Sequence, residues 1–316
     1  MENKNFLNSI NKAVKYLKNK QNNNGSICLN GDTTWDVWET ANAIISINLV
    51  GSLENNDILN RATKFLLNSK REDHSYYPSS IYKKNEYGME TTPFTALALH
   101  KMGVKTDKII NFILNKQHPD GSWDIGVPEV TKRRHWPSVT GSVLYSLLSI
   151  GIKSKKIDKG IDYLINSQND DGSWGSNWVY YDSPYYPTHV ILPSLKLYGL
   201  ENSNTYTKAI EYIISTQKKD GSWNNKTNYK YKPSIEMRTA LALNSLLVNS
   251  IDSEYNKIKK GIDWLINTQK SDGHWSGGYF VGWGPDSGIH PGKKEDIYTT
   301  SLALRAFMNY KKNNEY

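Results

Sequence analysis

One heptapeptide recurs along the chain and constrains the fold more than any other feature. Intact copies with the pattern Gln-x-x-Asp-Gly-Ser/His-Trp occupy residues 117–123, 168–174, 217–223 and 269–275. A degraded copy begins at Gln21, and another, Ser69–Tyr76, has lost the Gln and the Gly and gained one residue. The six starts lie 48 to 52 residues apart, so six units fill all 316 residues. We therefore predict a single domain over residues 1–316.

Each unit predicts a pair of helices. The segment before each Gln, such as residues 157–165 before Gln168, carries apolar residues on one face only. The Asp-Gly pair ends that helix, because Gly accepts the left-handed conformation of a sharp turn. The second helix of each unit is apolar on almost every face and must be buried all round. These segments are Ala41–Leu49, Thr95–Met102, Ser142–Ile150, Val190–Leu197, Thr239–Leu247 and Thr300–Met308. An inner ring inside an outer ring follows, so the predicted fold class is all-α, an (α/α)6 barrel.

The heptapeptides resemble the QW repeats of the superfamily that contains squalene–hopene cyclases, class II terpene cyclases and protein prenyltransferase β-subunits. The resemblance covers the whole chain and is closest to a monodomain class II terpene cyclase. It implies that the repeat residues are structural, with each Gln bonded to backbone at helix ends and each Trp packed beside it. The site must therefore be sought elsewhere, at the starts of the inner helices and in the loops beside them.

The start of the second inner helix carries the strongest candidate for catalysis. Class II terpene cyclases protonate an alkene or epoxide there, with the middle aspartate of a D-x-D-D or D-x-D-T-T motif. Residues 88–92, Gly-Met-Glu-Thr-Thr, resemble that motif with Gly88 in place of the first Asp and Glu90 in place of the middle one. The resemblance implies that Glu90 is the proton donor and that Thr91 lies beside the substrate. A carboxylic acid protonates an alkene only if an apolar setting keeps it neutral.

Other polar residues near the inner-helix starts are expected to support this acid. Triterpene cyclases use a His on the third inner helix, where this chain has Ser142, so His135 is the expected replacement. Asp36, Glu39 and Asp296 are expected to orient the substrate or take the final proton, although helix dipoles alone also favour acids at such positions. His100 and His189 are interpreted as structural groups.

The last inner helix resembles that of protein prenyltransferase β-subunits. Residues 291–300 follow the pattern P-G-K-x-x-D-x-Y-H-T, with Thr299 at the place of the zinc-binding His. The single cysteine, Cys28, lies in the first repeat, far from that segment. A zinc-activated thiolate needs those ligands, so protein prenylation is not expected. The match instead indicates that Lys293 and Tyr298 face a diphosphate.

Charge and aromatic content complete the predicted site. The formal charge of +8 permits an anionic partner, and the basic candidates for an acidic head group are Arg134, Lys232, Arg238 and Lys293. The 10 Trp and 21 Tyr against 6 Phe indicate an aromatic-lined cavity. Its predicted lining residues are Trp38, Trp136, Tyr186, Trp283 and Tyr298. A carbocation over such a ring gains roughly 1–2 kcal/mol per contact.

The predicted function is proton-initiated cyclisation of an isoprenoid, either a prenyl diphosphate or a prenylated aromatic. Two alternatives stay open: a polysaccharide lyase or glycosidase on the same barrel, and a non-catalytic isoprenoid- or peptide-binding scaffold. No metal or cofactor is expected, except Mg²⁺ if the substrate carries a diphosphate. The expected partner is the small isoprenoid, with no nucleic acid, and the basic charge allows a peripheral membrane contact. One cysteine and a polar N-terminus predict a cytoplasmic protein. The oligomeric state is left open.

Overall fold

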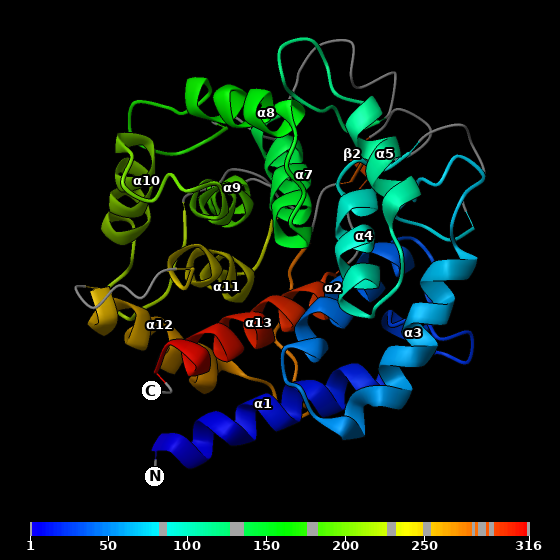
Figure 1. Ribbon diagram of the computed structural model, residues 1–316. Coiled ribbons are helices and arrows are strands. Elements are labelled where there is room, and N and C mark those ends of the chain that lie inside the picture. The colour runs from blue at the N-terminus through cyan, green and yellow to red at the C-terminus, as the bar shows by residue number, and fades with distance from the viewer. Residues whose placement is uncertain are drawn as a thin grey trace.

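The computed structural model shows two concentric rings of helices (Figure 1). It describes residues 2–81, 87–126, 136–175, 183–225, 232–248, 254–279, 282–283, 289–290 and 294–314. The inner helices are α2 (Asp36–Asn48), α4 (Thr91–Lys101), α7 (Pro137–Ile150), α9 (Tyr185–Tyr198), α11 (Ile235–Leu246) and α13 (Asp296–Asn314). The outer helices are α1 (Glu2–Asn19), α3 (Asn56–Asn68), α5 (Asp107–Asn115), α8 (Lys155–Asn166), α10 (Asn204–Ser215) and α12 (Tyr255–Thr268). The predicted all-α (α/α)6 fold is confirmed.

The inner ring is closed. Each inner helix packs against the next one along the chain, and α13 packs against α2. The outer helix between two inner helices carries the chain back, so all six inner helices begin at the same end of the barrel. Besides the helices, the described residues contain one antiparallel pair of short strands, β1 (Gly282–Trp283) and β2 (Ile289–His290). Nowhere in the described residues is a helix both long and apolar enough to cross a membrane.

The repeated Gln connects each heptapeptide to the next outer helix. The side-chain amide of Gln217 donates to the carbonyl oxygen of Gly221 in its own turn, at 2.9 Å, and to that of Lys257 near the start of α12, also at 2.9 Å. Gln269 does the same across the ends of the chain, because its amide donates to the Ser9 carbonyl of α1 at 3.0 Å. The predicted structural role of these residues is confirmed, and the Gln269 contact joins the last repeat to the first.

The repeated Trp fixes each turn to the helix before it and, in most units, to the inner helix after it. The indole N–H of Trp223 donates to the Ile213 carbonyl of α10 at 2.7 Å, and its backbone N–H donates to the Thr239 hydroxyl of α11 at 3.0 Å. The residue at the Trp position donates in the same way to Thr40, Thr92, Thr140 and Thr300. These threonines were not predicted from the sequence. Their signal was a Thr recurring on the inner helices with nearly the period of the heptapeptide.

Candidate functional site

Glu90 lies at the start of α4, inside the barrel. Its side chain is 6% exposed, and Thr91, the first residue of the helix, is 1% exposed. The turn before it is held by the backbone N–H of Gly88, which donates to the Tyr76 carbonyl at 2.9 Å. A Cβ on Gly88 would lie 2.9 Å from Pro78 Cδ and 3.0 Å from Thr91 Oγ1. The Gly that replaces the first motif aspartate is therefore required by the packing of this turn.

Contacts of the Glu90 carboxyl group cross the interior of the ring. The Tyr186 hydroxyl, from α9, donates to Glu90 Oε1 at 3.3 Å. Because α7 separates α4 from α9 in the ring, this bond can only pass through the interior. The hydroxyl oxygen of Tyr298, on α13, lies 3.4 Å from Nε2 of His189, on α9. In the ring, α11 separates those two helices. The inner face of the ring thus brings a carboxyl group, two phenols and an imidazole together.

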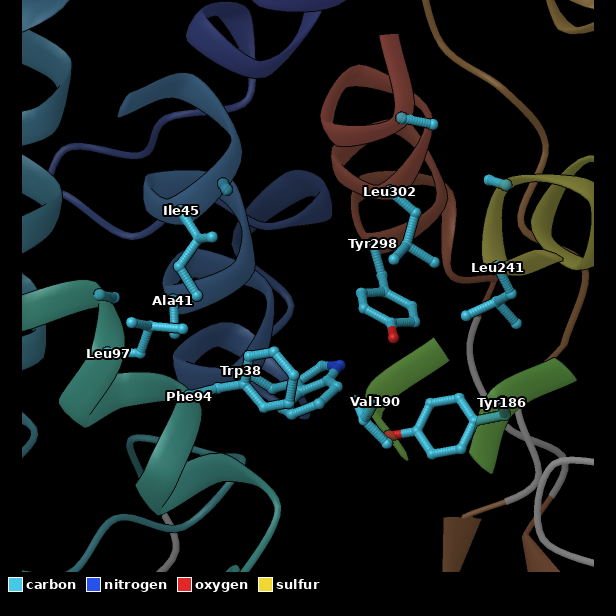
Figure 2. Close-up of a cluster of buried hydrophobic side chains, with 14 of the residues drawn as sticks. Trp38, Ala41, Ile45, Phe94, Leu97, Tyr186, Val190, Leu241, Tyr298 and Leu302 are labelled. Carbon is cyan, nitrogen blue, oxygen red and sulfur yellow. The ribbon is translucent and has the colours of Figure 1, made fainter. Parts of the chain in front are cut away.

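Aromatic rings enclose this group on the α2 and α4 side. The Trp38 ring packs edge-on against Phe94 with centroids 5.1 Å apart, and its centroid lies 5.4 Å from that of Tyr298. Figure 2 shows Trp38, Tyr186 and Tyr298 pointing toward one another from three helices. Each of these side chains is less than one tenth exposed. The arrangement places π faces beside a buried acid, as stabilisation of a carbocation requires.

The imidazole of His189 is held neutral and in one tautomer. Burial and the nearby Arg305 charge together lower the pKa of His189 to about 3, against a hydrogen bond to the Tyr186 backbone that raises it. Its Nδ1 lies against the Tyr186 carbonyl oxygen, which only accepts, so Nδ1 carries the proton. Nε2 is then an acceptor for the Tyr298 hydroxyl.

Tyr298 stays protonated in this setting. Burial raises the pKa of Tyr298, and the Glu90 and Glu295 charges raise it further, whereas Arg305 and a hydrogen bond with Tyr186 oppose the shift. Its hydroxyl proton is therefore available to His189. The polar chain runs from Glu90 through Tyr186 and Tyr298 to His189.

The buried imidazole gives the stability of the protein a pH dependence. The folded-state pKa of about 3 lies below the ordinary value of 6.5, so between those values the unfolded chain binds a proton that the folded protein does not. The free energy of unfolding should fall with falling pH in this window by about 1.4 kcal/mol per unit from this group. Urea denaturation at pH 4.5 to 6.5 should show a shallower pH dependence for His189→Gln than for the exposed-residue control His100→Gln. An unchanged slope in His189→Gln would contradict this assignment.

A second buried carboxylate, which was not predicted from the sequence, lies near this group of side chains. Glu295 is 2% exposed and immediately precedes α13, as Glu90 immediately precedes α4. Its charge acts on Tyr298, three residues along the chain. Residues three apart share a helix face, so the spacing of Glu295 from Tyr298 in the sequence could have indicated that the two lie together.

The three other predicted acids bind elsewhere. Both carboxylate oxygens of Asp36 accept from Ser80, from its backbone N–H at 2.8 Å and from its hydroxyl. Asp296 Oδ1 accepts from the Gly277 N–H at 2.7 Å, and Oδ2 lies 3.9 Å from His274 Nε2. Burial raises the pKa of Tyr16 on α1, and the charges of Asp296, Asp272 and Glu39 raise it further. The charges of Glu39 and Asp296 therefore act toward the outer helix α1. Their predicted roles in proton transfer stay predictions.

The remaining predicted binding residues are placed as follows. Trp136 immediately precedes α7 and is half-buried, and Lys232 is exposed. Arg238 on α11 is 2% exposed and donates through Nη1 to Asn224 Oδ1 at 2.7 Å. Arg134, His135 and Lys293 lie outside the described residues, and of Trp283 only the backbone, in β1, is described. His189, interpreted from sequence as structural, lies beside Tyr298 in the group that also contains Glu90 and Tyr186.

No metal centre is seen among the residues that the structure describes. Groups of three or more His, Cys, Asp or Glu side chains arranged for a metal ion are absent from that part of the chain. The acids that could serve a cation are divided between the interior, with Glu90 and Glu295, and the α1 side, with Glu39 and Asp296. A Mg²⁺ ion carried in by a diphosphate stays a prediction.

Comparison with known families decides the assignment. Residues 134–312, more than half of the chain, match the family model described as the squalene-hopene cyclase C-terminal domain. The chain belongs to the squalene–hopene cyclase family. Residues 4–102 match the prenyltransferase alpha-alpha toroid domain, so the resemblance of the heptapeptides to this superfamily is confirmed.

Two squalene–hopene cyclases are related to this family member in sequence. That of Alicyclobacillus acidocaldarius is 27% identical over 305 residues, covering 78% of this chain and 46% of the relative. That of Zymomonas mobilis is 32% identical over 146 residues, covering 43% of this chain and 21% of the relative. The chain thus spans less than half the length of these curated relatives.

Solved structures of similar fold include terpene cyclases. The type II terpene cyclase MstE from Scytonema has a TM-score of 0.78 at 18% identity, with 98% of this chain and 99% of that one covered. A structure of an MstE variant with its substrate, geranylgeranyl dihydroxybenzoate, also has a TM-score of 0.78, at 18% identity and 98% of each chain. A possible GH105 family member from Salmonella enterica has a TM-score of 0.66 at 14% identity, covering 98% and 94%. At these identities the likeness shows the fold alone.

Proposed function

We propose that this chain is a terpene cyclase of the class II type, which cyclises an isoprenoid after protonating its terminal alkene. The observation that carries the proposal is the buried Glu90 carboxyl group, which is bonded across the ring to Tyr186 and acts on Tyr298, whose ring lies beside Trp38. Family membership supports it, since the relatives with the matching domain are squalene–hopene cyclases. The sugar-enzyme alternative rests on fold likeness alone.

The proposed first step is transfer of the Glu90 proton. The carboxylic acid O–H breaks, and the alkene π pair forms a new C–H bond at one carbon and leaves a tertiary cation at the other. Tyr186 donates to Oε1, so it stabilises the carboxylate as its charge develops. Tyr298 and His189 hold Tyr186 in place from behind through the hydroxyl–imidazole contact and the His189 bond to the Tyr186 carbonyl. These two are positioning residues.

Ring closure and termination follow from the same interior. A second alkene of the chain attacks the cation, and Trp38 and Phe94 offer π faces to the charge as it moves. Loss of a proton from the final cation restores a neutral isomer of the substrate. Glu295, buried beside Tyr298, is the acceptor that we propose in this interior. Asp36, Glu39 and Asp296 stay predictions from sequence, because their contacts lie elsewhere.

The substrate proposed is a prenyl diphosphate or a prenylated aromatic. The second class is supported by geranylgeranyl dihydroxybenzoate, the substrate bound to the MstE variant of the same fold. Contact of a diphosphate and Mg²⁺ with Arg134, Lys232, Arg238 and Lys293 stays a prediction from sequence.

Product analysis tests the proposal directly. We expect incubation with farnesyl diphosphate, geranylgeranyl diphosphate or a geranylgeranylated aromatic acid to give a cyclic isomer with the mass of its substrate by mass spectrometry. Binding of these probes without turnover would identify a scaffold instead. Turnover of unsaturated oligosaccharides, with none of isoprenoids, would identify a sugar enzyme.

A further inference from the structure

Arg305 is a cation buried inside the barrel. It lies in the middle of α13, and its side chain is 4% exposed. Tyr298 lies seven residues earlier, which is two helical turns, so both side chains belong to the same face of α13. That separation is about 10 Å along the helix axis. Leu302, between them, points to the same side as Tyr298 in Figure 2.

The partners of Arg305 are neutral. Its Nη2 donates to Asn42 Oδ1 at 3.2 Å and to Ser46 Oγ at 3.5 Å, both from α2. No atom of the described residues accepts a hydrogen bond from its Nε–H. None of the ion pairs found within the described residues includes Arg305. Asn42 and Ser46 follow Trp38 at intervals of four, so they continue the inward face of α2.

Other titratable groups feel the charge of Arg305, although no carboxylate of the described residues forms an ion pair with it. Burial lowers the pKa of Lys101, at the end of α4, and the charges of Arg305 and Lys312 lower it further. The Arg305 charge also lowers the pKa of His189 and of Tyr298, which places it on the same interior as the Glu90 group. A desolvated charge costs several kcal/mol unless it is paired, so buried cations are paired or bind a ligand.

The geometry points to Arg305 as the binding site for the acidic head group of the substrate, a carboxylate or a phosphate. The guanidinium is a planar fork of N–H donors that fits two oxygens of one oxyanion. Asn42 and Ser46 hold it from one side through Nη2 and leave other donors for the ligand. The head would then lie toward the far end of the inner helices, and the chain would extend from it to Glu90. This placement replaces the one predicted from sequence, in which Arg134, Lys232, Arg238 and Lys293 hold the head at the opposite end of the barrel. This inference rests on the proposed function, because it names the chemistry of the substrate of the same site.

Binding measurements separate this inference from the proposed cyclisation. Titration calorimetry would use the folded full chain carrying Glu90→Gln, so that bound probes are not consumed. The probes are geranylgeraniol, geranylgeranoic acid and geranylgeranyl diphosphate, which share a tail and differ in the head. We expect both anions to bind more tightly than the alcohol by about tenfold to a hundredfold. Whichever of the two anions binds more tightly shows whether the natural head group is a carboxylate or a phosphate.

The variants assign that preference to one side chain. Arg305→Met, of similar volume, should abolish the preference and leave the affinity for the alcohol unchanged, and Arg305→Lys should restore part of it. Arg61→Met, on the exposed face of α3, is the matched control and should bind as the parent does. The inference is wrong if the Glu90→Gln parent binds the anions no more tightly than the alcohol, or if Arg305→Met still prefers the anions. Either result would identify Arg305 as a purely structural residue.

The outcome does not depend on one variant or on turnover. If Arg305→Met fails to fold, Arg305→Lys still decides the matter: a weakened preference for the anions assigns it to residue 305, and an unchanged preference overturns the inference. If anions are preferred but no cyclic product forms, the proposed function fails and the anion site stands. If neutral isoprenoids cyclise and no preference exists, the anion site fails and the proposed function stands.

Discussion

Replacement of Glu90 by Gln should abolish cyclisation with the fold intact. The amide keeps the size of the side chain and the acceptor for the Tyr186 hydroxyl, but it has no acidic proton to transfer. A general acid contributes about 10² to 10⁴ in rate, so the turnover number should fall at least a hundredfold. Initial rates of product formation by mass spectrometry, at saturating substrate, measure the effect.

Two controls accompany this variant. Glu72→Gln makes the same chemical change on the exposed surface and should leave the rate unchanged. Glu90→Asp keeps the acid but withdraws it by one methylene, so it should retain part of the activity. Wild-type turnover in Glu90→Gln would remove Glu90 as the proton donor.

Replacement of Gly273 by Ala should open the ring between its last and first repeats. Gly273 has φ of +101° and approaches α1 so closely that a Cβ would lie 2.3 Å from the Lys12 carbonyl oxygen. Gly103 also has positive φ, +75°, but a Cβ there would meet nothing within 4 Å. Gly103→Ala therefore shows the cost of the backbone conformation alone, about 1–2 kcal/mol.

The difference between the two glycine variants measures the close approach. Gly273→Ala should lower the free energy of unfolding by about 1–3 kcal/mol more than Gly103→Ala does, because the added methyl must displace α1. Urea denaturation followed by circular dichroism gives both values. Equal losses would mean that the junction of α1 with the last repeat is not tightly packed.

The fold was predictable because its determinants are local and repeated. Each Gln bonds both its own turn and the next outer helix, so one heptapeptide encodes a turn and a neighbour contact together. The recurring inner-helix Thr was overlooked because a single Thr in a helix carries no signal. Its role appears only when the Trp N–H that it accepts is in place.

The candidate site was predictable only in part, because position at a helix start does not fix the direction of a side chain. Successive helical residues turn by about 100°, so a residue two places from an inward one points away. Asp296 precedes the inward Tyr298 by two residues and bonds Gly277 instead. Glu90 precedes the inward Phe94 by four and shares its face. His189 was missed since its partner, Tyr298, is over a hundred residues away.

Cyclisation in heavy water tests the central claim most directly, because the source of the first proton is recorded in the product. If an exchangeable acid starts the reaction, the product formed in D₂O carries one deuterium, at the carbon that was the terminal alkene, and Glu90→Gln forms none of it. A cyclic product of the ordinary mass, free of deuterium, would contradict proton transfer from Glu90 and point to another way of generating the cation.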